Sequence, residues 1–85
     1  MKVWIPSPLH SYSGRSQVEA GGTTLAELLL DLDRQFPGIR FRMVDEQDRL
    51  RRHMRCFIAG EAVFDLARPL APDEEVIFVQ ALSGG

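Results

Sequence analysis

The clearest pattern of apolar and polar positions is a helical one between residues 24 and 36. Its apolar members recur at intervals of three and four, at Leu25, Leu28, Leu29, Leu32 and Phe36. This spacing predicts an α-helix with one continuous apolar face. Thr24 and Glu27 fit a capping box, in which the Thr24 hydroxyl accepts from the Glu27 amide and the Glu27 carboxylate accepts from the Thr24 amide. Pro37-Gly38 should end the helix, because proline disfavours helical geometry in the residue before it.

Short runs with strand character surround this helix, at residues 3–5, 16–20, 55–59 and 75–81. A proline ends the first run, since it cannot donate to a strand ladder. Residues 7–14 are rich in Ser, Pro and Gly and predict a loop. Residues 39–53 are charged and less periodic, with a predicted turn at residues 45–48. Residues 63–70 fit a brief strand or a single helical turn, and Pro72-Asp73 a further turn.

The order of these elements is strand, strand, helix, strand, short element, strand. One helix can cover one face of a small sheet, so the order predicts an α+β fold in which the first and last strands lie parallel at the sheet centre. That layout is the β-grasp, or ubiquitin-like, arrangement: a mixed sheet of four to five strands with one main helix across one face. The 85 residues fit one domain, which we expect to span residues 1–81, with residues 82–85 as a flexible C-terminal Gly-Gly tail.

Composition narrows the classes of function. A net charge of −2 argues weakly against nucleic acid as a direct partner, because phosphate binding needs clustered cations. The single cysteine, Cys56, makes a disulfide scaffold unexpected and fits a small buried hydrophobe. No apolar run approaches the roughly 20 residues that span a bilayer, and no signal peptide is recognisable, so we expect a cytoplasmic protein without a membrane partner. His10 and His53 lie far apart without clustered ligands, so no metal site is expected.

The final strand is apolar at both parities, which predicts that both of its faces are covered. By analogy with ubiquitin-like sheets, the helix side should hold Val76, Phe78, Cys56 and Ile58. The other side should then present an outer apolar patch of Phe57, Ile77 and Val79 that docks partners, with Leu82 beside it. The alternative is that the segment from Trp4 to Tyr12 covers this face.

Several segments along nearly the whole chain resemble one known family. They are Ile5-Pro6-Ser7-Pro8-Leu9 with Tyr12-Ser13-Gly14, Thr24-Leu25-Ala26-Glu27-Leu28-Leu29, Pro37-Gly38-Ile39-Arg40-Phe41-Arg42, Leu50-Arg51-Arg52-His53, and Leu70-Ala71-Pro72-Asp73-Glu74-Glu75-Val76 before the final Gly84-Gly85. Their order resembles the MoaD/ThiS family of ubiquitin-like sulfur carriers. Residues 37–53 are most similar to the carriers that supply sulfur for cysteine synthesis, with the small subunits of molybdopterin synthase close behind.

The resemblance implies a specific chemistry at the C-terminus. An ATP-dependent activating enzyme of the ThiF/MoeB type would adenylate the Gly85 carboxylate, and a sulfur atom would displace AMP to leave a thiocarboxylate. Gly84 would give the access that this narrow approach needs, since glycine carries no side chain. A cysteine synthase-like enzyme or the large subunit of a molybdopterin synthase would accept the sulfur. No resident cofactor is implied, because ATP is used by the partner, and the chain itself would be a carrier rather than an enzyme.

Other interpretations stay open at this point. The Gly-Gly end also fits a frayed terminus without a function of its own. The chain could then be a plain β-grasp interaction domain. It could also be a constitutive subunit of a molybdopterin-synthase-type enzyme. A ubiquitin-like modifier that forms isopeptide bonds through Gly85 is a further alternative. The only lysine, Lys2, gives few sites for lysine-linked chains and favours the carrier. The basic run of Arg49, Arg51, Arg52 and Arg55 fits a solvated charged face, or a surface for an acidic partner.

Overall fold

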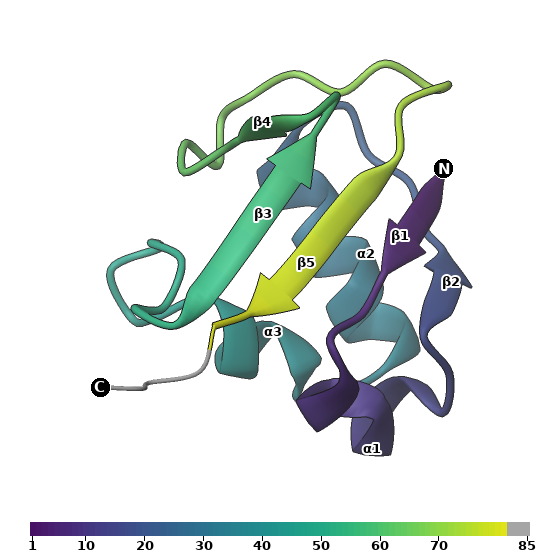
Figure 1. Ribbon diagram of the computed structural model, residues 1–85, viewed down its shortest axis with the longest axis vertical. Coiled ribbons are helices and arrows are strands. Elements are labelled where there is room, and N and C mark those ends of the chain that lie inside the picture. Colours follow the sequence, from purple (N-terminus) through teal and green to yellow (C-terminus); the bar gives the residue numbers. More distant parts are fainter. Residues whose placement is uncertain (82–85) are drawn as a thin grey trace.

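Five strands form one mixed sheet with the order β2-β1-β5-β3-β4 in the computed structural model, which describes residues 1–81 (Figure 1). The strands are β1 (Lys2–Trp4), β2 (Gln17–Glu19), β3 (Met54–Ile58), β4 (Glu61–Ala62) and β5 (Val76–Gln80). β1 and β5 pair in parallel, and the remaining neighbours pair antiparallel. The predicted β-grasp topology is therefore confirmed, with the last strand at the centre of the sheet. The predicted tail, residues 82–85, lies outside the described residues.

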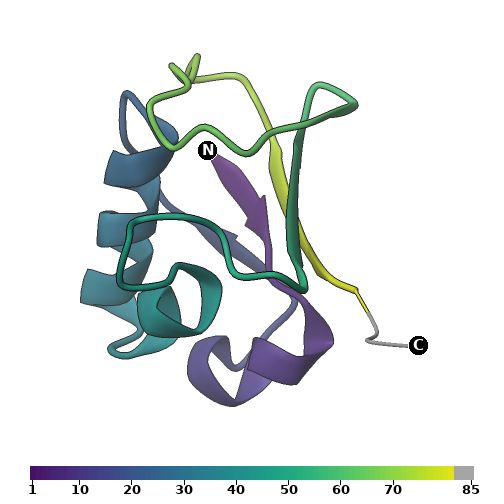
Figure 2. The same ribbon diagram turned by 90° about the vertical axis from the view of Figure 1, so that its left-hand side faces the viewer.

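The main helix, α2 (Leu25–Gln35), packs on one face of the sheet, and the other face carries no helix of the described chain (Figure 2). Four leucines of its predicted apolar face are buried without measurable exposure: Leu25, Leu28, Leu29 and Leu32. Phe36 follows the helix and is half-buried against the same core. Val76, Phe78, Cys56 and Ile58 line the helix side of the sheet and are all buried, as predicted.

The N-terminal cap of α2 differs in one partner from the predicted capping box. The Thr24 hydroxyl accepts from the Glu27 amide at 3.2 Å, as predicted. The Glu27 carboxylate, however, accepts from the amide and the hydroxyl of Thr23, at 2.8 and 2.7 Å, and not from Thr24. The Thr23 amide, followed by its hydroxyl, lowers the pKa of Glu27 because both donors favour the charged carboxylate.

Two short helical segments correct the prediction of a loop over residues 7–14. A 3₁₀ helix covers Ser7–Leu9, and α1 (His10–Ser13) follows it and ends at Gly14 with a φ of 74°. A proline in the first turn of this segment costs no hydrogen bond, because amides in a first turn have no acceptor within the helix. Leu9 is buried in the core. The polar composition of residues 7–14 therefore did not indicate this helical segment, which packs on the core through Leu9.

A third helix, α3 (Ile39–Met43), lies within the charged and less periodic residues 39–53, where the sequence pattern predicted no helix. Ile39 and Met43 lie one turn apart and are both fully buried. Asp33 of α2 caps α3, because its carboxylate accepts from the amides of Gly38 and Arg40 at 3.1 and 3.2 Å. The predicted turn at residues 45–48 is present, with Gln47 and Arg49 amides donating to Asp45.

The segment between β3 and β5 is less regular than expected. It contains the two-residue strand β4, which the sequence pattern did not indicate. Residues 63–70 form neither the predicted strand nor a helical turn, but they pair with the start of α2 through the isolated bridge between Thr24 and Pro69. The predicted turn at Pro72-Asp73 is present, and β5 begins one residue after the expected position.

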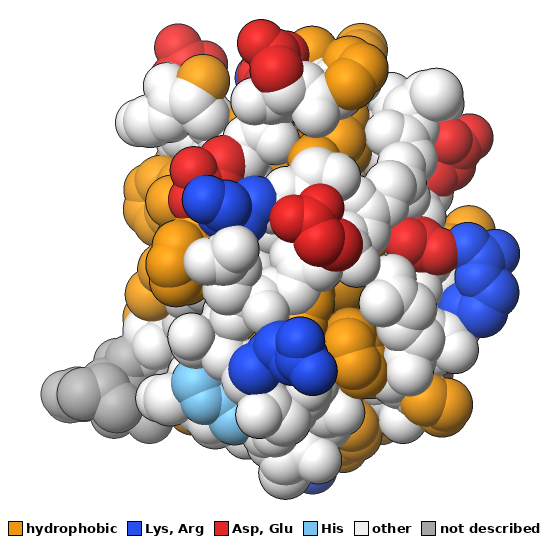
Figure 3. Space-filling model, turned by 90° about the vertical axis from the view of Figure 1, so that its right-hand side faces the viewer, with side chains coloured by type: hydrophobic (Ala, Val, Ile, Leu, Met, Phe, Trp, Pro, Cys, Tyr) orange, Lys and Arg blue, Asp and Glu red, His pale blue; other side chains and the backbone are white. Residues whose placement is uncertain are grey.

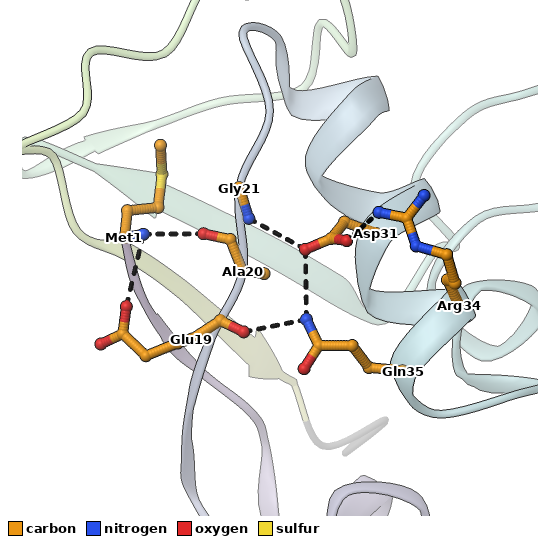
Figure 4. Close-up of polar contacts among 7 residues, drawn as sticks. All are labelled: Met1, Glu19, Ala20, Gly21, Asp31, Arg34 and Gln35. Atoms are coloured by element: carbon orange, nitrogen blue, oxygen red, sulfur yellow. Dashed lines mark hydrogen bonds and ion pairs between the residues drawn. The ribbon is translucent and has the colours of Figure 1, made fainter.

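A polar network fixes the connection between β2 and α2 (Figure 4). Asp31 of α2 accepts from the Gly21 amide at 3.0 Å and pairs with Arg34, and Gln35 donates to the Glu19 carbonyl at 2.9 Å. The Gly21 amide, and then Arg34, lowers the pKa of Asp31 because both favour its charged form. The first residues after β2 are thus tied to the exposed side of the helix that they precede.

Candidate functional site at the end of the central strand

The predicted reactive residues Gly84 and Gly85, and Leu82 beside them, lie outside the described residues. What the structure describes is the segment that leads to them. β5 is bonded on one side to β1 and on the other to β3, and the Ala81 amide still donates to the His53 carbonyl at 2.6 Å. The backbone is therefore held in the sheet up to Ala81, three residues before the Gly-Gly pair.

The outer patch, Phe57, Ile77 and Val79, lies on the sheet face opposite α2. Ile77 and Val79 are 39% and 41% exposed, and Phe57 is half-buried. Ile77 is in register with Trp4 of β1 and with Phe57 of β3, so these three side chains form one row across the sheet. Hydrophobic side chains follow the left margin of Figure 3, which is the outer side of the sheet. The segment from Trp4 to Tyr12 does not bury this face, so the exposure of the patch is as predicted, and its docking role stays a prediction.

Cys56 lies on the opposite face, where it is 1% exposed among the core residues. Burial raises the pKa of the Cys56 thiol to about 12, although Arg68 acts weakly in the other direction. The thiolate is the nucleophilic form, so we expect this buried thiol to react slowly at neutral pH. The interpretation of Cys56 as a buried hydrophobe is confirmed.

The two histidines serve separate structural contacts. A ring nitrogen of His10, Nε2, lies 2.8 Å from the Ile5 carbonyl, whereas His53 is exposed and uses its backbone carbonyl to hold Ala81. Among residues 1–81, no group of three or more His, Cys, Asp or Glu side chains could hold a metal ion. No helix in this part of the chain is long and apolar enough to cross a membrane.

A groove of about 490 Å³ lies beside the end of β5 and was not predicted. Its lining residues are Pro8, Leu9, Ser11, Tyr12, Phe41, Arg42, Arg51 and Gln80, and we call it the arginine groove. Arg42 donates through Nε to the Tyr12 hydroxyl at 3.0 Å. Arg51 donates through Nε to the Phe41 carbonyl at 2.6 Å and lies 4.6 Å from the centre of the Phe41 ring, a cation–π geometry.

The structure also divides the basic run that the sequence presents as one unit. Arg51 enters the arginine groove, whereas Arg55 donates to the carbonyls of Arg52 and Met54 at 2.8 and 3.0 Å. Arg49 donates to Gln47 in the neighbouring turn. Arg42, which lies outside the predicted run, joins Arg51 because α3 brings it to the same surface.

Comparison with known proteins agrees with this geometry. The chain is a β-grasp protein, and the model of the ThiS family matches residues 3–85, so it belongs to the ThiS family. It is similar to the sulfur carrier protein CysO of Mycobacterium tuberculosis, with 30% identity over 89 aligned positions that cover 98% of this chain and 96% of the relative.

Solved structures show the same likeness in three dimensions. The Amycolatopsis orientalis BexX/CysO complex contains a chain with a TM-score of 0.90 and 28% identity, covering 99% of this chain and 98% of that one. The crystal structure of Mycobacterium tuberculosis CysO has a TM-score of 0.89 and 29% identity over 95% of this chain and 98% of that one. SAMP1 from Haloferax volcanii, at 23% identity and a TM-score of 0.75, shares the fold.

Proposed function

We propose that this protein is a sulfur carrier of the CysO type, which bears sulfur as a thiocarboxylate on Gly85. The observation that carries the proposal is the ThiS-family match, which extends through the Gly-Gly end to residue 85. The similarity to sulfur carrier protein CysO over nearly the whole of both chains supports the same role.

The chemistry suits a C-terminal glycine. A carboxylate is a poor electrophile, and adenylation by ATP converts one of its oxygens into part of a leaving group, with release of pyrophosphate. A sulfide sulfur then attacks the carbonyl carbon, and AMP departs with that oxygen. Gly84 and Gly85 place no side chain beside the reacting carbonyl.

The fold supplies a rigid support for this reaction. Because β5 is bonded on both sides and Ala81 is held by His53, a partner that binds the sheet also fixes the origin of the last four residues. The protein itself contributes no general acid or base in this proposal, and the chemistry belongs to its partner enzymes. ATP is a co-substrate of the activating partner and not a resident cofactor of this chain.

The partners that we propose are an activating enzyme of the ThiF/MoeB type and a sulfur-accepting enzyme. The acceptor is a cysteine synthase-like enzyme or a molybdopterin synthase large subunit. A CysO chain similar to this one has been crystallised in complex with BexX, which supports a protein partner for the fold. The outer patch, Phe57, Ile77 and Val79, together with Leu82, is the docking surface that we propose.

Mass spectrometry of protein from its native host tests the carrier role. We expect a fraction of intact molecules to gain the mass that replacement of one oxygen by sulfur adds. Oxidation adds nearly the same mass, so alkylation and fragmentation must place the sulfur on Gly85. If no sulfur is found there even after incubation with the activating enzyme, ATP and sulfide, the carrier role is wrong. Gly85 joined to a lysine of another protein would instead support the modifier alternative.

A further inference from the structure

The arginine groove holds two positive charges and no negative one among the described residues that line it. The groove is therefore a local concentration of positive charge on a chain whose net charge is −2. Asp45 is an acid that interacts electrostatically with Arg51. Its carboxylate is directed to the amides of Gln47 and Arg49, at 2.8 and 3.1 Å, and it forms no ion pair with Arg51.

Arg42 and Arg51 differ from the paired arginines of the fold. Arg34, Arg40 and Arg68 each contact a carboxylate, whereas no described carboxylate pairs with either groove arginine. Each groove arginine uses only Nε, on the Tyr12 hydroxyl or the Phe41 carbonyl. A guanidinium has five N–H donors, so four on each arginine have no acceptor in the described chain.

The position of the groove connects it with the proposed reactive end. Gln80, the last residue of β5, lines it, and the next residue, Ala81, is held by His53. A smaller hollow of about 120 Å³ continues the groove and is lined by Arg42, Arg51, His53, Met54 and Gln80. The two arginines therefore lie between two adjoining hollows, along a track that passes the end of the central strand.

The shape and chemistry of this track favour a chain segment over a small ion. Each guanidinium is held through Nε, which leaves its other nitrogens to pair with a carboxylate of a peptide. Tyr12 and Phe41 offer half-buried and exposed aromatic surface to the side chains between such carboxylates. A nucleic acid is disfavoured because the rest of the surface is net negative.

We infer that the arginine groove binds an acidic segment of the enzyme that activates the C-terminus, and that Arg42 and Arg51 pair with its carboxylates. The inference rests on the proposed function for the identity of the enzyme. The groove orients the partner at the end of β5, where the last four residues begin. Contacts of this kind act mainly on the rate and the orientation of association.

The first experiment needs no enzyme. Isotope-labelled protein is titrated with a synthetic peptide of alternating Asp, Glu and Leu, and in parallel with a matched Asn/Gln/Leu peptide, inorganic phosphate and AMP. We expect the acidic peptide alone to shift the NMR signals of the Arg42 and Arg51 Nε groups and the Gln80 amide. The double variant Arg42→Gln/Arg51→Gln should lower its affinity about tenfold. Signals that move mainly elsewhere, or equal shifts with phosphate or AMP, would overturn the inference.

The second experiment measures sulfur loading of Gly85 by the activating enzyme as a function of carrier concentration. The double Gln variant should raise KM about tenfold at low salt with kcat unchanged, and the difference should vanish near 1 M salt, where charges are screened within about 3 Å. Arg42→Lys/Arg51→Lys keeps the charge but not the guanidinium donors, so it should restore only part of the affinity. Arg34→Gln, which removes one charge from the exposed side of α2, should leave KM unchanged.

The two experiments separate failure of the groove from failure of the carrier role. Loading of the wild type with no effect of the double Gln variant would refute the groove and leave the carrier role intact. Localised peptide binding without any loading of the wild type would refute the carrier role alone. If the difference in KM between the wild type and the double Gln variant stays the same from low salt to 1 M salt, the partner does not recognise the charge of the groove and the inference is wrong.

Discussion

Among the glycines of residues 1–81, Gly22 leaves the least room for an added methyl group, because it lies against the start of α2. A Cβ on Gly22 would lie 2.6 Å from the Leu28 backbone nitrogen and 2.9 Å from the Glu27 carbonyl carbon. These are backbone atoms of the first helical turn and cannot rotate away. The Leu28 amide donates to the Thr24 carbonyl at 3.0 Å, so the methyl group would push on the cap itself.

Gly21 provides a matched control in the same turn. A Cβ there meets nothing within 4 Å, and neither glycine has a left-handed φ. Both Gly→Ala changes restrict the unfolded chain by a similar amount, which stabilises the protein by about 0.4–1 kcal/mol. This contribution cancels in the comparison, so the difference between the variants isolates the contact with Leu28 and Glu27.

We expect Gly22→Ala to be less stable than Gly21→Ala by about 1–3 kcal/mol, the usual cost of overpacking a tight site. For a domain of this size, 1 kcal/mol corresponds to about 4–8 °C in Tm, so the two variants should differ by roughly 10 °C. Circular dichroism during thermal and urea unfolding measures this difference, with the urea slope m as a check on two-state behaviour.

Equal stability of the two variants would refute the reasoning. It would mean that the turn after β2 moves away from α2 at negligible cost, despite the hydrogen bond from Gly21 to Asp31. A lower m for Gly22→Ala would instead indicate a changed native or unfolded state, and the free-energy comparison would not then report on the contact.

Three further predictions concern the site and the core. Cys56 should resist thiol reagents at pH 8 in the native protein and react rapidly in urea, because burial raises its pKa to about 12; rapid labelling of the native state would contradict this. Val79→Asp should weaken binding to the activating or the accepting enzyme without lowering Tm, since the side chain is 41% exposed, and unchanged affinity in a binding titration would remove the docking role. Deletion of Gly85 should abolish sulfur loading in the mass assay and leave Tm unchanged, because the described core involves residues 1–81 only; a large loss of stability would show that the end is structural.

The helices and strands that the sequence predicted are those whose pattern is local. The leucine spacing of α2 lies within one element, so its buried face could be assigned directly. The apolar run of β5 predicted a strand with two covered faces, and the analogy with ubiquitin-like sheets assigned which of them meets the helix. α3 was not predicted because its only buried residues, Ile39 and Met43, form a single i,i+4 pair among arginines. Its cap comes from Asp33, which the sequence places in the preceding helix.

Of the two surfaces at the candidate site, the sequence predicted the outer patch but not the arginine groove. The outer patch was predicted from the apolar residues at both parities of β5 and from the analogy with ubiquitin-like sheets, and Ile77 and Val79 are exposed on that face. The arginine groove could not be predicted, because it joins side chains of four segments that are far apart in the chain. The groove depends on α1 and α3, the two helices that the sequence pattern did not predict.

The outer patch and the arginine groove both include residues of β5. In the carrier that we propose, which would bind an activating and then an accepting enzyme, they suit different tasks. The outer patch contains only three apolar side chains of partial exposure, so its burial supports a modest and reversible interface. Added apolar area would slow dissociation, which is where most affinity differences arise, and would delay transfer to the next enzyme. Charge at the groove raises the rate of encounter and sets orientation at less cost to release. Val79 of the outer patch and Gln80 of the groove are neighbours in β5, so the proposed carrier would be captured quickly, aligned at its reactive end, and released.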